Sequence, residues 1–153
     1  MAAGLGYAAA PALAAGNAPM NLSFQASSGN SASWVIHGQE AQLSVNNSTS
    51  SGYAVISLHH FSSTLPTTEP SFTATNYASG TPRIVIFMSN TAVFFIYPNG
   101  VVTGSTPTAY ATFVAANAGA TVAGVFIVAD TSQPVPYTTD VTSFQYAGVD
   151  LIS

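Results

Sequence analysis

The sequence predicts an all-β protein with a single domain, folded as a β-sandwich or a jelly-roll-like barrel, with one short helix near residues 107–118. Three observations lead to this prediction. The chain has 153 residues, a length that fits one domain with a hydrophobic core. Beyond Met20, short runs of Val, Ile, Phe, Tyr and Thr alternate with clusters of Ser, Asn, Gly and Pro, as in strands separated by turns. No internal repeat is visible, which excludes a solenoid.

The N-terminal segment differs in composition from the rest of the chain. Residues 1–19 are rich in Ala, Gly and Pro and contain no charged side chain. One interpretation is an apolar arm that packs on a neighbouring subunit, because its small side chains cannot form a core of their own. The other is the remnant of a leader, since Ala12-Leu13-Ala14 has the small-x-small form of a signal-peptidase site. We therefore divide the chain into this arm or leader remnant and a β domain at 20–153.

The first strands of the β domain are expected where apolar and polar residues alternate with a period of two. Within one of them, this alternation places Trp34 and Ile36 on the same face. The strands are expected at 21–26, 33–36, 41–45 and 52–61.

Later strands are more apolar. The runs at 83–88 and 92–97 are continuous, so we expect a central hairpin that is buried on both faces. Residues 121–128 form a strand of the same kind. The chain is expected to close with a hairpin of 141–146 and 149–152 over Ala147-Gly148.

One segment has helical spacing. Thr106 supplies a capping hydroxyl, Pro107 suits the first turn, and Gly119 ends the helix. Tyr110, Phe113, Val114 and Asn117 then follow at helical spacing.

Charge is scarce. The sequence has one Arg and no Lys, five Asp and Glu, three His, no Cys and a net charge of -4, while 19 Ser and 17 Thr supply its polarity. A surface that binds nucleic-acid phosphates or anionic lipids needs clustered Lys and Arg side chains. With a single Arg, nucleic-acid binding is excluded. No membrane insertion is expected, since residues 1–19 are too short and too interrupted by Gly and Pro for a membrane-spanning helix. A surface whose polarity comes from hydroxyl groups suits an extracellular or cell-surface protein. Its low charge favours association between copies of the chain.

Catalysis is not expected, because the sequence contains no nucleophile elbow, phosphate loop, dinucleotide fingerprint or metal-protease motif. His59 and His60 are adjacent, so in a strand they point to opposite faces and cannot chelate one metal together. The five carboxylates are scattered along the chain. We therefore predict no catalytic residue, no cofactor and no metal site.

Arg83 is the sole arginine and opens the most apolar run of the sequence. A lone guanidinium beside a core strand requires a carboxylate or several carbonyl oxygens. We expect a structural ion pair with Asp130, at the end of another apolar strand. The competing interpretation is an anchor for a carboxylate or sugar ligand.

Three asparagines occupy N-glycosylation acceptor sequences, namely Asn21, Asn46 and Asn47. The latter two lie in a polar turn, which is the better acceptor. The aromatic residues permit a sugar-binding platform, although the single Trp34 is expected in the core.

The combined features favour a secreted structural protein that self-assembles into an extracellular filament, sheath or coat. In composition and texture, the chain is similar to subunits of extracellular microbial filaments and surface layers. The expected partners are further copies of this chain, as a homo-oligomer or polymer, and glycans. One alternative is a carbohydrate-binding or adhesive module, and a second is a viral capsid jelly roll.

Overall fold

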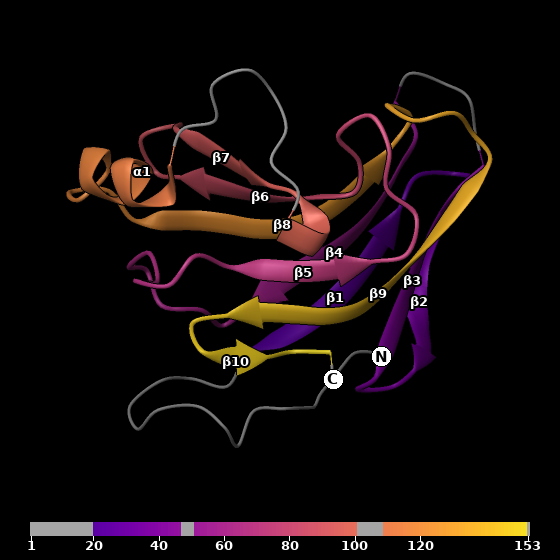
Figure 1. The fold of residues 1–153 in the computed structure, drawn as a ribbon, viewed down its shortest axis with the longest axis horizontal. Coiled ribbons are helices and arrows are strands. Elements are labelled where there is room, and N and C mark those ends of the chain that lie inside the picture. Colours follow the sequence, from indigo (N-terminus) through magenta and orange to yellow (C-terminus); the bar gives the residue numbers. More distant parts are fainter. Residues whose placement is uncertain (1–19, 47–50, 101–108, 153) are drawn as a thin grey trace.

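The computed structural model describes residues 20–46, 51–100 and 109–152. The described chain forms two antiparallel sheets of five strands each, which confirms the predicted all-β sandwich (Figure 1). The strands are β1 (Asn21–Ala26), β2 (Ser31–Ile36), β3 (Glu40–Val45), β4 (Tyr53–His59), β5 (Ser71–Ala74), β6 (Arg83–Met88), β7 (Val93–Ile96), β8 (Val122–Asp130), β9 (Tyr137–Tyr146) and β10 (Val149–Asp150).

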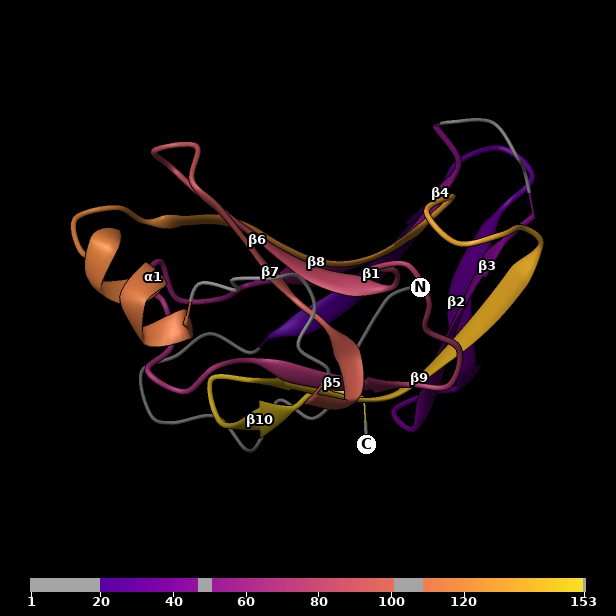
Figure 2. The ribbon, with the colours of Figure 1, turned by 45° about the horizontal axis from the view of Figure 1, so that its top comes forward.

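The first sheet has the order β1-β4-β8-β6-β7. The second has the order β10-β9-β3-β2, and β5 also pairs with β9. β1 and β2 lie on one lateral side of the sandwich, where the rings of Phe24 and Trp34 meet with centroids 5.3 Å apart. Strands β7 and β5 lie on the other side. Figure 2 shows the two sheets as separate layers.

The core lies between the sheets and obeys the period-two alternation of the strands. In the first sheet, Ala54 and Ile56 of β4 and Ile127 of β8 are fully buried. In the second, Leu43 of β3 and Phe144 of β9 are equally buried. In β4 the alternating residues Val55 and Ser57 are only half-buried, because they point to the opposite face of the sheet.

Helix α1 (Tyr110–Ala116) closes one end of the sandwich (Figure 1). The ring of Phe94 lies 4.8 Å from Phe113 and 5.6 Å from Tyr110, measured between centroids. The Tyr110 phenol donates a hydrogen bond of 2.7 Å to the Pro66 carbonyl. In the part of the chain described, no helix is long and apolar enough to span a membrane.

The start of the helix differs from the prediction. Its N-cap is Ala109, which makes no side-chain capping bond, and the helix begins only at Tyr110 because the Ala109 backbone is extended, with ψ of 143°. The predicted capping residues Thr106 and Pro107 lie outside the described residues. Of the four residues predicted at helical spacing, Tyr110, Phe113 and Asn117 are buried and Val114 is half-buried.

A short 3-10 turn, η2 (Pro98–Gly100), comes after β7 and bridges the two sheets. The Asn99 side-chain amide donates to the Ala74 carbonyl at 3.0 Å, and its oxygen accepts from the Ala74 amide at 3.1 Å. Asn99 thus takes the place of a strand partner at the end of β5. This side chain fastens β7 of the first sheet to β5 of the second.

The prediction of a central hairpin buried on both faces is wrong. β6 and β7 pair as expected, but within the described residues β7 is the edge of its sheet. Val93 and Phe95 of β7 are exposed, as is Phe87 of β6. The prediction failed because an exposed apolar face produces the same unbroken hydrophobic pattern as a doubly buried strand.

The expected pairing of Trp34 with Ile36 on one face is also wrong. A β-bulge between these residues adds one residue to β2 relative to β3. One extra residue reverses the facing of the side chains after it, so Ile36 lies opposite Glu40 and is 49% exposed. Trp34 itself is half-buried against Phe24.

Candidate functional site

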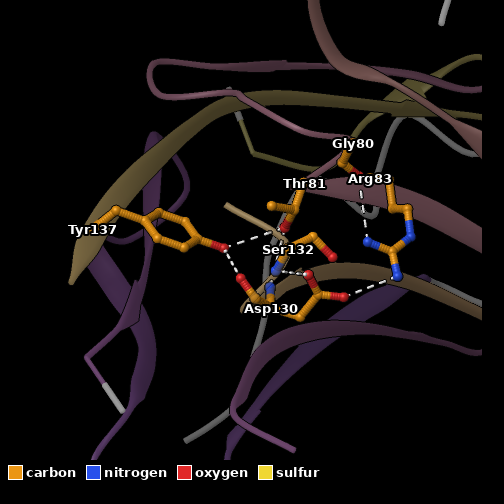
Figure 3. A network of polar contacts seen from close by, with 6 residues as sticks. All are labelled: Gly80, Thr81, Arg83, Asp130, Ser132 and Tyr137. Atoms are coloured by element: carbon orange, nitrogen blue, oxygen red, sulfur yellow. Dashed lines mark hydrogen bonds and ion pairs between the residues drawn. The ribbon is translucent and has the colours of Figure 1, made fainter. Parts of the chain in front are cut away.

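The ion pair of Arg83 and Asp130 occupies one end of the first sheet (Figure 3). Because β6 and β8 are neighbours, the start of one lies beside the end of the other, and Arg83 Nη2 is 2.9 Å from Asp130 Oδ2. Arg83 Nη1 donates a second hydrogen bond of 3.3 Å to the Gly80 carbonyl. The guanidinium also lies over the Phe95 ring, 5.4 Å from its centroid. Each of these contacts is internal to the chain.

A buried hydrogen-bond network supports this pair from behind (Figure 3). The fully buried Thr81 hydroxyl accepts the Asp130 amide at 3.0 Å and lies 3.2 Å from the Tyr137 phenol. The phenol donates a hydrogen bond of 2.6 Å to the Asp130 carbonyl. The network therefore joins β6, β8 and β9 across the two sheets.

Asp130 stays ionised to low pH. Burial alone would raise the pKa of its carboxyl, but hydrogen bonds from Ser132 and the neighbouring Arg83 guanidinium outweigh burial and hold that pKa below its ordinary value of 3.8. A depressed carboxyl pKa adds stability above the unfolded value of 3.8, and this stability is lost only as the pH falls below it. The ion pair is therefore intact throughout the neutral range.

Arg83→Met is expected to lower the free energy of unfolding by about 1–2 kcal/mol, between the values for surface and fully buried pairs. The side chains are 21% and 24% exposed, so the carboxylate left behind is partly hydrated. Denaturant unfolding measures the loss. The matched variant Arg83→Met/Asp130→Asn should lose less than the sum of the single variants. A variant that melts like the unaltered chain but no longer binds a sugar or carboxylate would make Arg83 a ligand anchor instead.

A cluster of exposed apolar side chains lies on the outer face of the first sheet, beside the ion pair. It consists of Phe87, Val93 and Phe95, exposed by 41%, 39% and 47%, and is named the β6–β7 patch. Val85 of β6 pairs with Phe95 of β7 on one side and with Phe126 of β8 on the other, and it is buried between them. Large apolar groups gathered on one face are typical of an interaction surface.

The patch has a defined shape because Gly124 leaves room for an aromatic ring. Gly124 pairs with Phe87, and a Cβ built on it would come within 2.7 Å of the Phe126 ring. Phe126 therefore lies flat along the sheet and meets Phe87 edge to face, with centroids 5.9 Å apart. A side chain at position 124 would displace this ring.

One row of the outer face becomes polar away from the patch. Across the sheet, the row that begins with Phe95 and Phe126 continues to Ser57 of β4 and Ser23 of β1. Ser23 contacts the His59 imidazole by a hydrogen bond. Along this row the outer face changes from aromatic at β7 to hydroxyl and imidazole at β4 and β1, whereas the neighbouring row keeps the half-buried Val55 and Val128.

A second exposed apolar cluster lies on the opposite lateral side. Val35 and Ile36, exposed by 50% and 49%, form the bulge of β2, and the pair is named the β2 bulge. Ile36 shares its face with Glu40, its cross-strand partner. In Figure 1, β2 lies toward the lower right and β6 with β7 toward the upper left. Every exposed large hydrophobic side chain of the described residues thus belongs to one of the two clusters.

The predicted glycosylation residues are not gathered in one place. Asn21 is half-buried in the edge strand β1, opposite His59. Asn46 is exposed at the end of β3, where its backbone amide donates to Asn30 at 2.7 Å. Asn47 lies outside the described residues, as do residues 1–19.

The described residues hold no group of three or more His, Asp or Glu that could bind a metal. A shallow depression lies between the loop 62–68 and the turn at Ala147-Gly148, and its lining carries no charged side chain. His37 packs on the Trp34 indole, with centroids 4.9 Å apart.

Comparison with protein-family models, curated proteins and solved structures finds no significant match to this chain. The fold and surfaces define a charge-poor antiparallel sandwich with apolar clusters at its two lateral edges. Sequence reasoning missed both clusters. The sequence shows the hydrophobic runs that contain Phe87 and Phe95, but it does not show which strand lies at the edge of a sheet.

Proposed function

We propose that this protein is a secreted structural subunit that self-assembles into an extracellular filament, sheath or coat through apolar and backbone contacts. The observation that carries the proposal is the pair of exposed apolar clusters at opposite edges of the sandwich. The lone Arg of the sequence is paired internally, so the surface has little charge to oppose contact between copies. The proposed role requires no catalytic group.

A carbohydrate-binding module is the alternative of a different class. Sugar platforms combine aromatic faces with hydrogen-bonding side chains beside them. The register neighbours of Phe87 and Phe95 are instead Val93, Val85 and Gly124, and the Arg83 guanidinium over Phe95 is already bonded to Asp130 and the Gly80 carbonyl. These apolar surroundings favour a protein partner over a sugar.

The proposal predicts large particles in native material. Electron microscopy of the full chain, at low and at high salt, should show filaments or sheets in both conditions, because screened charge pairs contribute little to a contact of this composition. Sedimentation should vary weakly with salt. Closed shells would indicate the capsid alternative. A monomer at all concentrations that is retained on a polysaccharide column would replace the structural role with the binding module.

A further inference from the structure

We propose that copies of this chain associate head to tail, with the β2 bulge of one copy seated on the β6–β7 patch of the next. This inference rests on the proposed function and names the contact that assembly would use. It concerns Val35 and Ile36 on one side, and Phe87, Val93 and Phe95 on the other.

The position of the clusters is the first argument. They lie on opposite lateral sides of the sandwich, since β2 adjoins β1 while β7 is fastened to β5 by Asn99. When a contact joins two different surfaces of the same chain, each copy that has bound one partner still has a free surface for another. Such a contact extends to filaments or rings, whereas a contact of one surface with itself stops at a dimer.

Charge at the border of each cluster favours this pairing. The Arg83 guanidinium lies over Phe95 in the β6–β7 patch, and Glu40 lies opposite Ile36 in the β2 bulge. Asp130 already pairs with Arg83, so the border of the patch carries little net charge, whereas a bulge that met its own copy would bring two Glu40 carboxylates together. The head-to-tail contact avoids this repulsion and places Glu40 beside the Arg83–Asp130 pair, which fixes orientation more than it adds affinity.

Shape and area agree with the same contact. The bulge projects two aliphatic side chains, and the patch offers an aromatic surface on which Phe126 lies flat over Gly124. Phe87 and Phe95 together expose on the order of 200 Å² of side chain. A standard interface buries about 800 Å² on each partner, so the two clusters form only the centre of the contact. The surrounding hydroxyl-bearing strands supply the rim.

Two variants of the full chain separate the halves of the contact. Phe87→Ser/Phe95→Ser removes the patch, and Val35→Ser/Ile36→Ser removes the bulge. Each alone should stay monomeric in sedimentation velocity where the unaltered chain assembles, with the dissociation constant raised at least about tenfold. Mixed in equal amounts, they should form dimers that grow no further, because each supplies the half that the other lacks. Phe95→Leu and Ile36→Val keep the apolar surface and should still assemble.

Cysteine trapping tests the same geometry without removing apolar surface. The sequence has no Cys, so Val93→Cys and Ile36→Cys, made as separate proteins of different length, introduce the only thiols. Oxidation of their mixture should give the mixed dimer in preference to either homodimer. Glu40→Arg should weaken assembly by placing a cation near Arg83, whereas Glu69→Arg makes the same change of charge at an exposed loop residue and should not.

Several results would overturn the head-to-tail contact. If each variant alone forms dimers and the mixture adds none, each cluster binds its own copy. If only the patch variant fails to assemble, the patch binds another partner, such as residues 1–19 of a second copy. If both variants assemble like the unaltered chain, the contact is wrong and the proposed function stands. If the unaltered chain never assembles, both fail.

Discussion

Phe144→Ala is expected to lower the free energy of unfolding by about 3–5 kcal/mol, the usual cost of truncating a fully buried Phe. Phe144 is 0% exposed in β9, opposite Phe72 of β5, so its removal leaves a cavity between strands that cannot collapse freely. The free energy of unfolding of a native domain is only about 5–15 kcal/mol in total. This variant should therefore be close to unfolding at ordinary temperature. The shift in denaturant midpoint measures the loss.

The chain offers a matched control for this substitution. Phe95→Ala removes the same atoms from a side chain that is 47% exposed on the outer face. Measured on dilute monomer, it should cost less, about 1–2 kcal/mol, because nearly half of this side chain is already exposed and only its contacts with Val85 and Arg83 are lost. Equal losses for the two variants would mean that the core is not where the structure places it.

Raising the pH above 10 is expected to unfold the protein. Burial raises the pKa of Tyr110 to about 12, with a further contribution from the Glu69 carboxylate. Burial also raises the pKa values of the Tyr146 and Tyr137 phenols above their ordinary value of 10.0. Above pH 10 the unfolded chain releases these protons and the folded chain does not. The stability that these groups support is therefore complete below pH 10 and is lost as the pH rises through the folded values.

Tyr146→Phe is the variant that tests this cause. The Tyr146 hydroxyl is buried and makes no hydrogen bond in the described structure, so its removal should leave stability at neutral pH unchanged or slightly higher. It should also move the alkaline transition to higher pH, because one buried group no longer has to ionise. Circular dichroism reports unfolding, and near-ultraviolet absorbance reports tyrosinate. Ionisation of all the tyrosines before any loss of structure would contradict the expectation.

The sequence by itself determined the class of fold and most strand positions. Where apolar and polar residues alternate, as in β1 and β3, only a strand places the apolar residues on one face. This period of two is a local property, so the sequence displays it. The helical face of Tyr110 and Phe113 was readable for the same reason. The four-residue strand β5 was missed, because its alternation rests on Phe72 and Ala74 alone, whereas a continuous apolar run marks the equally short β7.

Only the tertiary structure decided which apolar residues are exposed. Phe94 and Phe95 are adjacent and both apolar, yet Phe94 packs on α1 while Phe95 lies on the outer face. The choice depends on the order of strands in the sheet, which is set by contacts far apart in the sequence. Likewise, one bulge turned Ile36 from the expected inner face to the outer one, since a single extra residue reverses side-chain direction. Composition determined that the surface has little charge, and the strand order determined where its apolar area lies.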